Sequence, residues 1–396
     1  MRILNRSFII KNLFINNCKE LFILRKYYFV QLLSPIIISF FILNLFMIDD
    51  LWGTPEINKI NVYEMTTRGN LDEIQNGDGI GYKDRYPLLN INELYNSCPD
   101  EIAIIVHGWS VDKNNAKERF DRVKMSLEHN NYYIPIIGFS WDSNIDWSDA
   151  KKMAKNNGPK LANFILELTD DCKQQPHNKE IKIRLIGHSL GSRVILSALD
   201  SINEKLPSDD NYKIESVHLI GAAVDNEEIS KNYGDYLFDT TNWYNWETVK
   251  DVYGGAIEER VIKFYNLYNP NDDILELRGY PQIYPSFEFD SALGQSGYQI
   301  FPYSIYYSLP ENYDEVNVQK EILPICDSDG DSNPDFWYQE GMTIYRGDNH
   351  GGYFGFRNGY DTTTLTSDGA MNILVDQWNN VGPTIDQNAR LSSICK

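Results

Sequence analysis

The sequence predicts an α/β protein with a doubly wound, mostly parallel sheet, because short apolar runs alternate with helix-like segments along much of the chain. The expected strands are residues 101–106, 134–140, 181–186, 215–221 and 261–267. The expected helices are residues 115–128, 147–169, 189–204 and 367–378, the last of which should complete the core. Continuous apolar strands are typical of parallel sheets that helices cover on both faces.

Length, composition and charge set limits on the class of protein. The chain has 396 residues, of which 42% are hydrophobic, so it can bury a large core in one or two globular domains. Its formal net charge is −20. Nucleic-acid-binding domains usually present a basic surface. The acidic balance therefore argues against a nucleic-acid partner.

The N-terminal region differs in charge from the rest of the chain. Residues 1–26 are rich in Lys and Arg, and residues 27–48 form an uncharged run that would span about 33 Å as a helix. We expect residues 1–26 to be cytoplasmic, residues 27–48 to be a single transmembrane signal anchor in the cell membrane, and the acidic remainder to be extracytoplasmic. A cleaved signal peptide is the alternative. The run is longer than a usual signal core and is not followed by a small-residue cleavage site.

Beyond the expected anchor, the sequence divides into two regions of different regularity. Residues 49–99 predict a linker followed by irregular or edge-strand structure, and residues 100–396 form the expected α/β domain. Within this domain, residues 279–345 lack helical periodicity and are rich in Tyr, Phe, Pro and Gly. This insertion is interpreted either as a lid over a site or as a surface insertion without a chemical role.

Four cysteines follow the apolar run, an even number that an oxidising compartment allows to pair. They are Cys98, Cys172, Cys326 and Cys395. The pairing of Cys98 with Cys172 is favoured because each precedes an apolar strand-like run, so both could lie at one end of the sheet. Four buried thiols are the alternative interpretation.

The segment 187–191, Gly-His-Ser-Leu-Gly, contains the candidate nucleophile. An expected strand precedes it and an expected helix follows it. A sharp turn between the two would expose the hydroxyl of Ser189 at the carboxyl end of the sheet, and the glycines at 187 and 191 would let strand and helix approach closely. A serine hydroxyl needs a base, an orienting acid and oxyanion donors to act as a nucleophile.

The other parts of such a site follow the ends of other expected strands. The His107-Gly108-Trp109 turn can direct a backbone N–H at the site, with the N–H of Leu190 as a second donor, and His107 itself is interpreted as a turn-stabilising residue. His350, in a glycine-rich loop, is the best-placed base. Asp272 and Asp273 follow the strand expected at 261–267 and are candidate acids.

The ordered motifs HGW, GHSLG, NDD and NHGGY, spread over residues 101–378, resemble the α/β-hydrolase superfamily and its lipase- and esterase-like serine hydrolases. The segment GFSWDSN, residues 138–144, also resembles a strand of uncharacterised prokaryotic-type members. The resemblance implies the α/β-hydrolase fold, Ser189 as nucleophile, His350 as base, an aspartate as orienting acid, and the Trp109 and Leu190 N–H groups as oxyanion donors. Some lipases place the acid one strand earlier. Asp225 is therefore an alternative to Asp272, as is Asp273, although Asp225 could instead cap a helix.

A second motif, in residues 326–337, suggests a calcium site. Its carboxylates alternate with small or turn residues and are Asp327, Asp329, Asp331 and Asp335. Such carboxylates can converge on a hard cation, although the spacing departs from an EF-hand. The segment resembles the loops of thrombospondin type 3 repeats, which implies Ca²⁺ with the carbonyl of Asn333 as a further ligand. We expect a structural role for the ion. A solvated acidic turn is the alternative.

The resulting hypothesis is a membrane-anchored serine hydrolase that cleaves carboxylic esters of small molecules or lipids without a catalytic cofactor. Two alternatives stay open. One is a noncatalytic, calcium-dependent surface binding module on a hydrolase scaffold. The other is an acyltransferase or peptidase that uses the same triad, since a fold does not determine the acceptor of the acyl group.

Overall fold

The computed structural model divides the chain into two compact units, residues 1–59 and 60–396. All described residues belong to the second unit. They are residues 60–68, 91–174, 176–207, 211–231, 252–272, 274–275, 292–298, 308–319, 321–322, 337–339, 343–345, 350–358, 361–367 and 369–380. The expected anchor at 27–48 lies outside them. None of the helices in these described ranges is both long and apolar enough to cross a bilayer.

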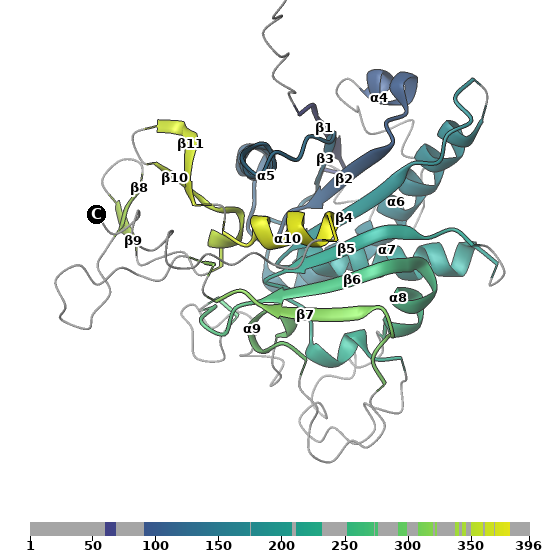
Figure 1. Ribbon diagram of the computed structural model, residues 1–396. Helices are drawn as coiled ribbons and strands as arrows, with labels where there is room; N and C mark the ends of the chain where they lie inside the picture. The colour runs from purple at the N-terminus through teal and green to yellow at the C-terminus, as the bar shows by residue number, and fades with distance from the viewer. Residues whose placement is uncertain are drawn as a thin grey trace, which may run out of the picture. The chain divides into compact units, whose positions relative to one another are not determined.

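A seven-stranded sheet with the order β1-β3-β2-β4-β5-β6-β7 forms the centre of the described unit, and all of its neighbouring strands are parallel (Figure 1). The strands are β1 (Val62–Thr66), β2 (Glu101–Val106), β3 (Ile136–Ser140), β4 (Lys182–His188), β5 (Ile214–Ile220), β6 (Val261–Tyr268) and β7 (Tyr313–Asn317). This sheet and its flanking helices fit the α/β-hydrolase fold and confirm the predicted α/β class.

Helices cover both faces of this sheet (Figure 1). One face packs against α4 (Ile91–Ser97), α6 (Trp147–Lys173), α7 (Gly191–Lys205) and α8 (Gly254–Arg260). The other face packs against α5 (Lys113–His129) and α10 (Met371–Trp378). Shorter elements complete the description: η1 (Asn226–Ile229), α9 (Leu293–Ser296), β8 (Trp337–Gln339), β9 (Thr343–Tyr345), η3 (Gly352–Phe354), β10 (Phe356–Asn358) and β11 (Asp361–Ser367).

Strand β2 shows why its sequence reads as one apolar run. Ile102, Ile104 and Val106 join the core beneath α6 and α7, whereas Ala103 and Ile105 join the core beneath α5 and α10. Successive side chains of a strand point to opposite faces of the sheet. A strand covered on both faces therefore needs apolar side chains at every position, rather than at every second position.

The sheet contains two strands, β1 and β7, that do not correspond to any of the apolar runs in the sequence. Strand β1 lies within residues 49–99, and it pairs with β3 as an edge strand of the same sheet. Strand β7 lies within the insertion 279–345, which is therefore not irregular throughout, and it pairs with β6. The sequence of β7, Tyr-Asp-Glu-Val-Asn, is only partly buried and lacks an apolar run. An edge strand has one neighbour and needs less apolar surface.

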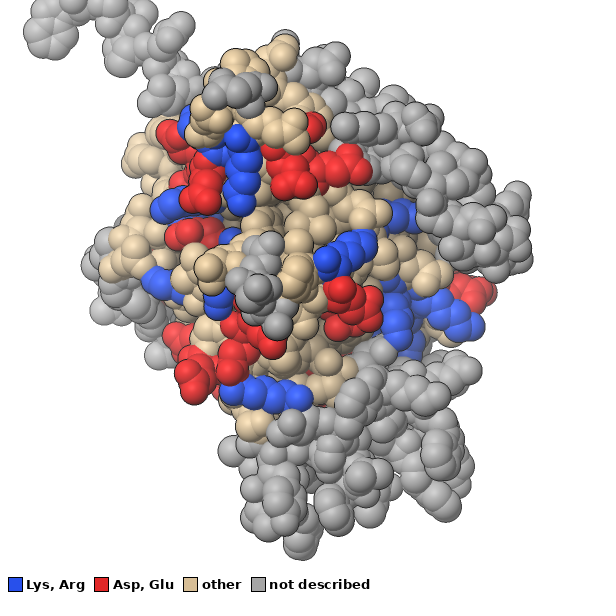
Figure 2. All heavy atoms as spheres, turned by 90° about the vertical axis from the view of Figure 1, so that its right-hand side faces the viewer, with Lys and Arg blue, Asp and Glu red and all other residues tan. Residues whose placement is uncertain are grey.

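Charged side chains of both signs are interspersed over the face of the molecule shown in Figure 2. No extended field of Lys and Arg is seen among the described residues on that face.

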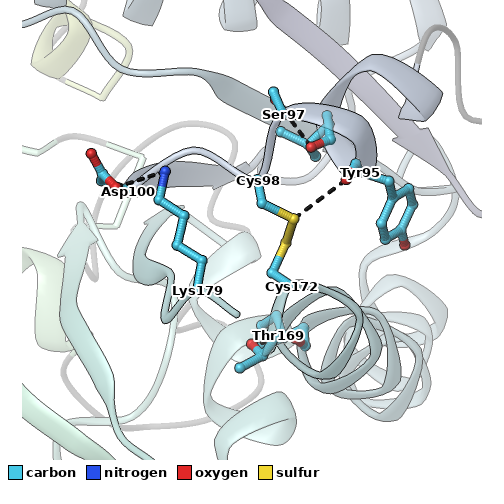
Figure 3. Close-up of a disulfide and its surroundings, with 9 residues drawn as sticks. Tyr95, Ser97, Cys98, Asp100, Thr169, Cys172 and Lys179 are labelled. Carbon is cyan, nitrogen blue, oxygen red and sulfur yellow. Dashed lines mark hydrogen bonds and ion pairs between the residues drawn. A yellow bond between two sulfur atoms is a disulfide. The ribbon is translucent and has the colours of Figure 1, made fainter. Parts of the chain in front are cut away.

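A disulfide between Cys98 and Cys172 joins the segment that enters β2 to the end of α6 (Figure 3). The two Cα atoms are 5.7 Å apart and the two residues are separated by 74 positions in the sequence. Beside it, Lys179 Nζ forms an ion pair with Asp100 at 2.7 Å. The favoured pairing is thus confirmed. Cys326 and Cys395 lie outside the described residues.

Candidate active site

Ser189 lies in the sharp turn between β4 and α7. Its φ is +53°, a left-handed conformation that is uncommon for a residue other than glycine and that concentrates at functional sites. The turn is attached to the neighbouring strand end, because the Ser189 N–H donates to the Ile220 carbonyl at 3.0 Å and the Ser189 carbonyl accepts from the Ala223 N–H at 3.1 Å. The backbone therefore holds the strained serine in place at the carboxyl end of the sheet.

The two glycines of the turn are required by the close approach of strand and helix. A Cβ at Gly191 would lie 2.3 Å from the Val106 carbonyl oxygen, and a Cβ at Gly187 would lie 2.9 Å from Ile195 Cδ1. Both distances are shorter than van der Waals contact. These positions explain why the sequence has glycine on either side of the serine.

The His107-Gly108-Trp109 turn at the end of β2 faces Ser189 directly. A Cβ at Gly108 would lie 2.6 Å from Ser189 Cβ and 3.2 Å from Ser189 Oγ. Within the described part of the chain, the backbone N–H groups of Trp109 and Leu190 have no hydrogen-bond acceptor. The turn thus brings one unpaired amide from each of two loops to the region of the serine.

His107 stabilises this turn by a network of hydrogen bonds. Its Nε2 accepts from the Trp141 N–H at 3.1 Å and from Arg68 at 3.0 Å, and its Nδ1–H donates to the Gly108 carbonyl at 2.9 Å. These partners determine the tautomer, because the amide and the guanidinium can only donate. Burial lowers the pKa of His107 to about 3. A neutral ring with both nitrogens engaged supports the turn and is not available as a base.

Asp272 and His350 are brought together from segments 78 residues apart. Asp272 Oδ2 lies 2.8 Å from His350 Nδ1, and the Asp272 side chain is fully buried. Its other oxygen, Oδ1, accepts from the Leu275 N–H at 3.2 Å. The Tyr353 hydroxyl is 3.5 Å from Oδ2, and burial raises the pKa of Tyr353 well above its ordinary value, so the hydroxyl stays protonated. The carboxylate is positioned to hold His350 with the proton on Nδ1.

His188, the residue before the serine, contacts the loop of His350. Its Nε2–H donates to the His350 carbonyl at 2.8 Å, and its ring packs against those of His350 and Phe354 at 4.9 and 5.0 Å between centroids. Burial holds the pKa of His188 well below its ordinary value, and the nearby His350 and Arg119 lower it further. His188 is therefore neutral and links the turn of the candidate nucleophile to the loop of the candidate base.

A cavity of about 270 Å³ opens between these elements. Its lining residues are Trp109, Ser110, Arg119, Trp147, Ser189, Ala223, Ile274, Leu275, His350 and Gly351. The side chains on its walls include two tryptophans, an isoleucine and a leucine. Ser189 and His350 both reach it, so the structure places the candidate nucleophile and the candidate base at one accessible hollow.

The other candidate residues from the sequence lie elsewhere or outside the described residues. Asp225 precedes η1, where its side chain makes no capping hydrogen bond, and its charge acts on Lys151. Asp273 is outside the described residues. So are all the candidate calcium ligands, Asp327, Asp329, Asp331, Asn333 and Asp335. Within the described ranges there is no cluster of three or more His, Cys, Asp or Glu residues that could hold a metal ion.

The fold and this geometry resemble those of α/β hydrolases, and a family comparison agrees with this over part of the chain. Residues 89–251 match a family model described as an alpha/beta hydrolase of unknown function (DUF900). This match covers less than half of the chain, and it includes the HGW and GHSLG motifs. No curated protein sequence matches the chain.

Several solved structures are similar to parts of the chain. A lipase-esterase related protein from Clostridium acetobutylicum is 15% identical, with a TM-score of 0.23 over 43% of this chain and 75% of that one. Phospholipase PlaB from Legionella pneumophila is 13% identical, with a TM-score of 0.25 over 47% and 42%. An esterase from Pyrococcus furiosus is 14% identical, with a TM-score of 0.24 over 44% and 63%. The functional argument therefore depends on the geometry of the site itself.

Sequence reasoning missed several residues that support the site. Arg68 comes from a region without a recognisable motif, and nothing in the sequence pairs it with His107. Trp141 directly follows the strand expected at 134–140, and Tyr353 lies within the NHGGY motif, so both could have been considered as supporting residues. Arg119 lies on α5, and its helical spacing gives no indication that it lines the cavity.

Proposed function

We propose that this protein is a serine hydrolase that cleaves carboxylic esters through a Ser189-Asp272-His350 triad and an acyl-enzyme. One observation carries the proposal. The Asp272–His350 pair, at 2.8 Å, and the strained Ser189 come from three separate loops, and Ser189 and His350 line one cavity. A scaffold that only bound a partner would have no need for a buried carboxylate oriented on a histidine beside a serine of positive φ.

The proposed reaction uses the groups in the order that their contacts indicate. Because His350 Nδ1–H donates to Asp272, Nε2 is the nitrogen that takes the proton of Ser189 Oγ as this oxygen attacks the ester carbonyl. The Trp109 and Leu190 N–H groups stabilise the negative oxygen of the tetrahedral intermediate. His350 then gives the proton to the departing alcohol. A water molecule then attacks the acyl carbonyl while His350 removes its proton, and His350 returns this proton to Ser189 Oγ as the bond to the acyl group breaks and the acid leaves.

The cavity fits a small-molecule or lipid ester with an apolar part. Its volume of about 270 Å³ is just below the usual range for ligand sites, which is roughly 300–1,000 Å³. Trp109, Trp147, Ile274 and Leu275 supply apolar surface on its walls. An acyltransferase or peptidase with the same triad differs only in the acceptor or the bond cleaved, so product analysis with water, alcohols and amines distinguishes these reactions from ester hydrolysis.

Two further proposals concern the location of the protein and its metal. Residues 27–48 anchor it in the cell membrane with the hydrolase domain outside the cytoplasm. The Cys98–Cys172 bridge supports this, because structural disulfides persist mainly in oxidising compartments. Residues 327–335 bind a structural Ca²⁺, which would add stability without supplying any step of the reaction.

Covalent labelling tests the proposed function. The full chain, purified with calcium, is treated with a fluorophosphonate and digested, and the labelled peptide is identified by mass spectrometry. We expect one label on Ser189, loss of the label in Ser189→Ala, and at least a thousandfold loss of ester hydrolysis in that variant. Ser110→Ala is the matched control, because Ser110 lines the same cavity but is not in the triad. Equal labelling of wild type and Ser189→Ala would refute the proposal, and calcium-dependent partner binding without hydrolysis would favour the binding-module alternative.

A further inference from the structure

Arg68 connects the edge of the sheet with the HGW turn. It lies two residues after the end of β1, and β3 separates β1 from β2 in the order of the sheet. Its Nε–H donates to Ser140 Oγ, at the end of β3, at 2.7 Å. Its Nη2 group donates to His107 Nε2 and to the Val111 carbonyl, both at 3.0 Å. One guanidinium therefore contacts both ends of segment 107–111, which contains the HGW turn.

Ser110 holds a strained conformation inside this segment. Its φ is +55°, a left-handed conformation that a residue with a Cβ adopts only at a cost in free energy. It directly follows Trp109, whose backbone N–H is the proposed oxyanion donor. If Ser110 relaxed to a negative φ while the chain after it stayed in place, the peptide groups before it would change direction. The direction of the Trp109 N–H therefore depends on the strain at Ser110.

Hydrogen bonds to Ser110 and Val111 hold the chain in this conformation. The Ser110 N–H donates to the Ser143 carbonyl at 3.0 Å, and the Val111 N–H donates to Ser143 Oγ at 3.2 Å. The bond from Arg68 to the Val111 carbonyl is charge-assisted, and such bonds are roughly twice as strong as neutral ones. A strained backbone persists only where its surroundings hold it. Arg68 supplies the charged contact of this set and joins it to His107 at the other end of the segment.

We propose that Arg68 is a positioning residue that holds the HGW turn in its strained conformation, so that the Trp109 N–H stays directed at the oxyanion. This inference rests on the proposed ester hydrolysis and adds a residue to it. Arg68 is not among the residues that line the cavity, so it acts on the reaction through the turn and not through contact with the substrate. The edge strand β1, which no apolar run indicates, thereby becomes part of the candidate active site.

Steady-state kinetics of the full-length protein with 4-nitrophenyl butyrate tests the role of Arg68. Arg68→Ala should lower kcat roughly ten- to hundredfold and change KM less than about twofold, because a displaced oxyanion donor is missed only in the transition state. Arg68→Lys should lose less, since an ammonium carries charge but cannot span the same set of acceptors. Arg184→Ala is the matched control, a buried arginine that bonds Glu101 and Ser216 at the amino end of the sheet, and its kcat should stay within about twofold of wild type. Wild-type kcat in both Arg68 variants would overturn the inference.

Glycine at position 110 separates the strain from other effects of Arg68. Glycine adopts a positive φ without the cost of a Cβ, so the loss of kcat caused by Arg68→Ala should be at least about fivefold smaller in a Ser110→Gly background. Ser110→Ala lacks the hydroxyl but keeps the Cβ, so the loss in that background should be undiminished. Equal losses in all three backgrounds would overturn the inference and would mean that the charge of Arg68 acts on the oxyanion directly.

Hydrogen exchange examines the turn without any turnover. The Ser110 and Val111 amides both donate to Ser143 and are protected while the turn is held. Arg68→Ala should speed their exchange by about tenfold or more, measured by mass spectrometry on peptides that cover the turn, and Arg184→Ala should not. This result supports Arg68 as the residue that holds the turn even if no variant hydrolyses an ester, an outcome that would refute only the proposed reaction. Unchanged exchange in Arg68→Ala would overturn the inference.

Discussion

The two ends of the parallel sheet are built in different ways. At the carboxyl ends of β2, β4 and β6, the chain holds buried polar groups, a serine with φ of +53° and a fully buried aspartate. At the amino end of β2, the Cys98–Cys172 disulfide and the exposed Lys179–Asp100 ion pair join the sheet to α6 and its following loop (Figure 3). The amino end also has a residue of positive φ, Cys98 at +37°, and the buried Arg184–Glu101 ion pair, but it is the end that carries the covalent connection.

This difference indicates how stability and chemistry are divided in the molecule. Buried polar groups and left-handed serine conformations cost free energy, and they persist only where the surrounding structure holds them. A disulfide stabilises the fold without any geometric demand on the site at the opposite end. Variants at the two ends should therefore change different measurements, activity at the carboxyl end and stability at the amino end.

The largest effect is expected at the buried acid. Asp272→Asn should keep the fold but lower kcat for an ester substrate by about four orders of magnitude, because the amide no longer holds His350 with its proton on Nδ1. Asp225→Asn is the matched control, a second buried aspartate at a strand end. Steady-state kinetics measures kcat for both variants. A larger loss of kcat in Asp225→Asn than in Asp272→Asn would identify Asp225, which follows the preceding strand, as the acid.

The next effect concerns the amino end of the sheet. Replacing Cys98 and Cys172 together by serine should lower the free energy of unfolding by about 4 kcal/mol, since the bridge closes a loop of 74 residues in the unfolded chain. Denaturant unfolding measures this change, and kcat/KM at 25 °C should stay within about twofold because the site is at the other end. Cys18→Ser controls for cysteine removal. A parallel loss of kcat/KM would show that the two ends are coupled.

The smallest of the three effects comes from the HGW turn. Gly108→Ala places a Cβ 2.6 Å from Ser189 Cβ and should displace the Trp109 N–H, lowering kcat about a hundredfold. Gly255→Ala is the matched control, because a Cβ there meets no atom within 4 Å. Circular dichroism verifies folding of both variants. Full activity in Gly108→Ala would mean that the turn does not supply an oxyanion donor.

The sequence predicts the interior of the fold better than its edges. Strands β2 and β3 are apolar at nearly every position, and β4, β5 and β6 each contain several apolar residues among a few polar ones, so all five are visible as runs. Strand β7 is mixed in polarity because it is an edge strand, and its partner β6 is distant in the sequence. Such edge strands form because they pair with a neighbouring strand, and not because their own sequence is hydrophobic. An inspection of the local sequence alone therefore does not predict them.

In the candidate site too, the sequence indicates residues that belong to local motifs and does not indicate contacts between distant segments. Ser189, Gly108 and His350 are marked by local motifs whose turns need small residues, so the sequence indicates them directly. The choice of Asp272 over Asp225 depends on which loop reaches His350, a long-range property that only the 2.8 Å contact reveals. Arg68 and Arg119 reach the site with long side chains from other elements. The local sequence does not show which residues such a side chain will contact.

The hydrogen bond from His188 to the His350 carbonyl has a consequence for how the chain tolerates change. Residue 188 is covalently next to the candidate nucleophile, so one peptide link and one hydrogen bond connect it to the loop of the candidate base. This connection does not pass through the 77 residues between Asp272 and His350. Changes in length outside α9 and β7, which pack within that stretch, should therefore leave the two candidate groups aligned.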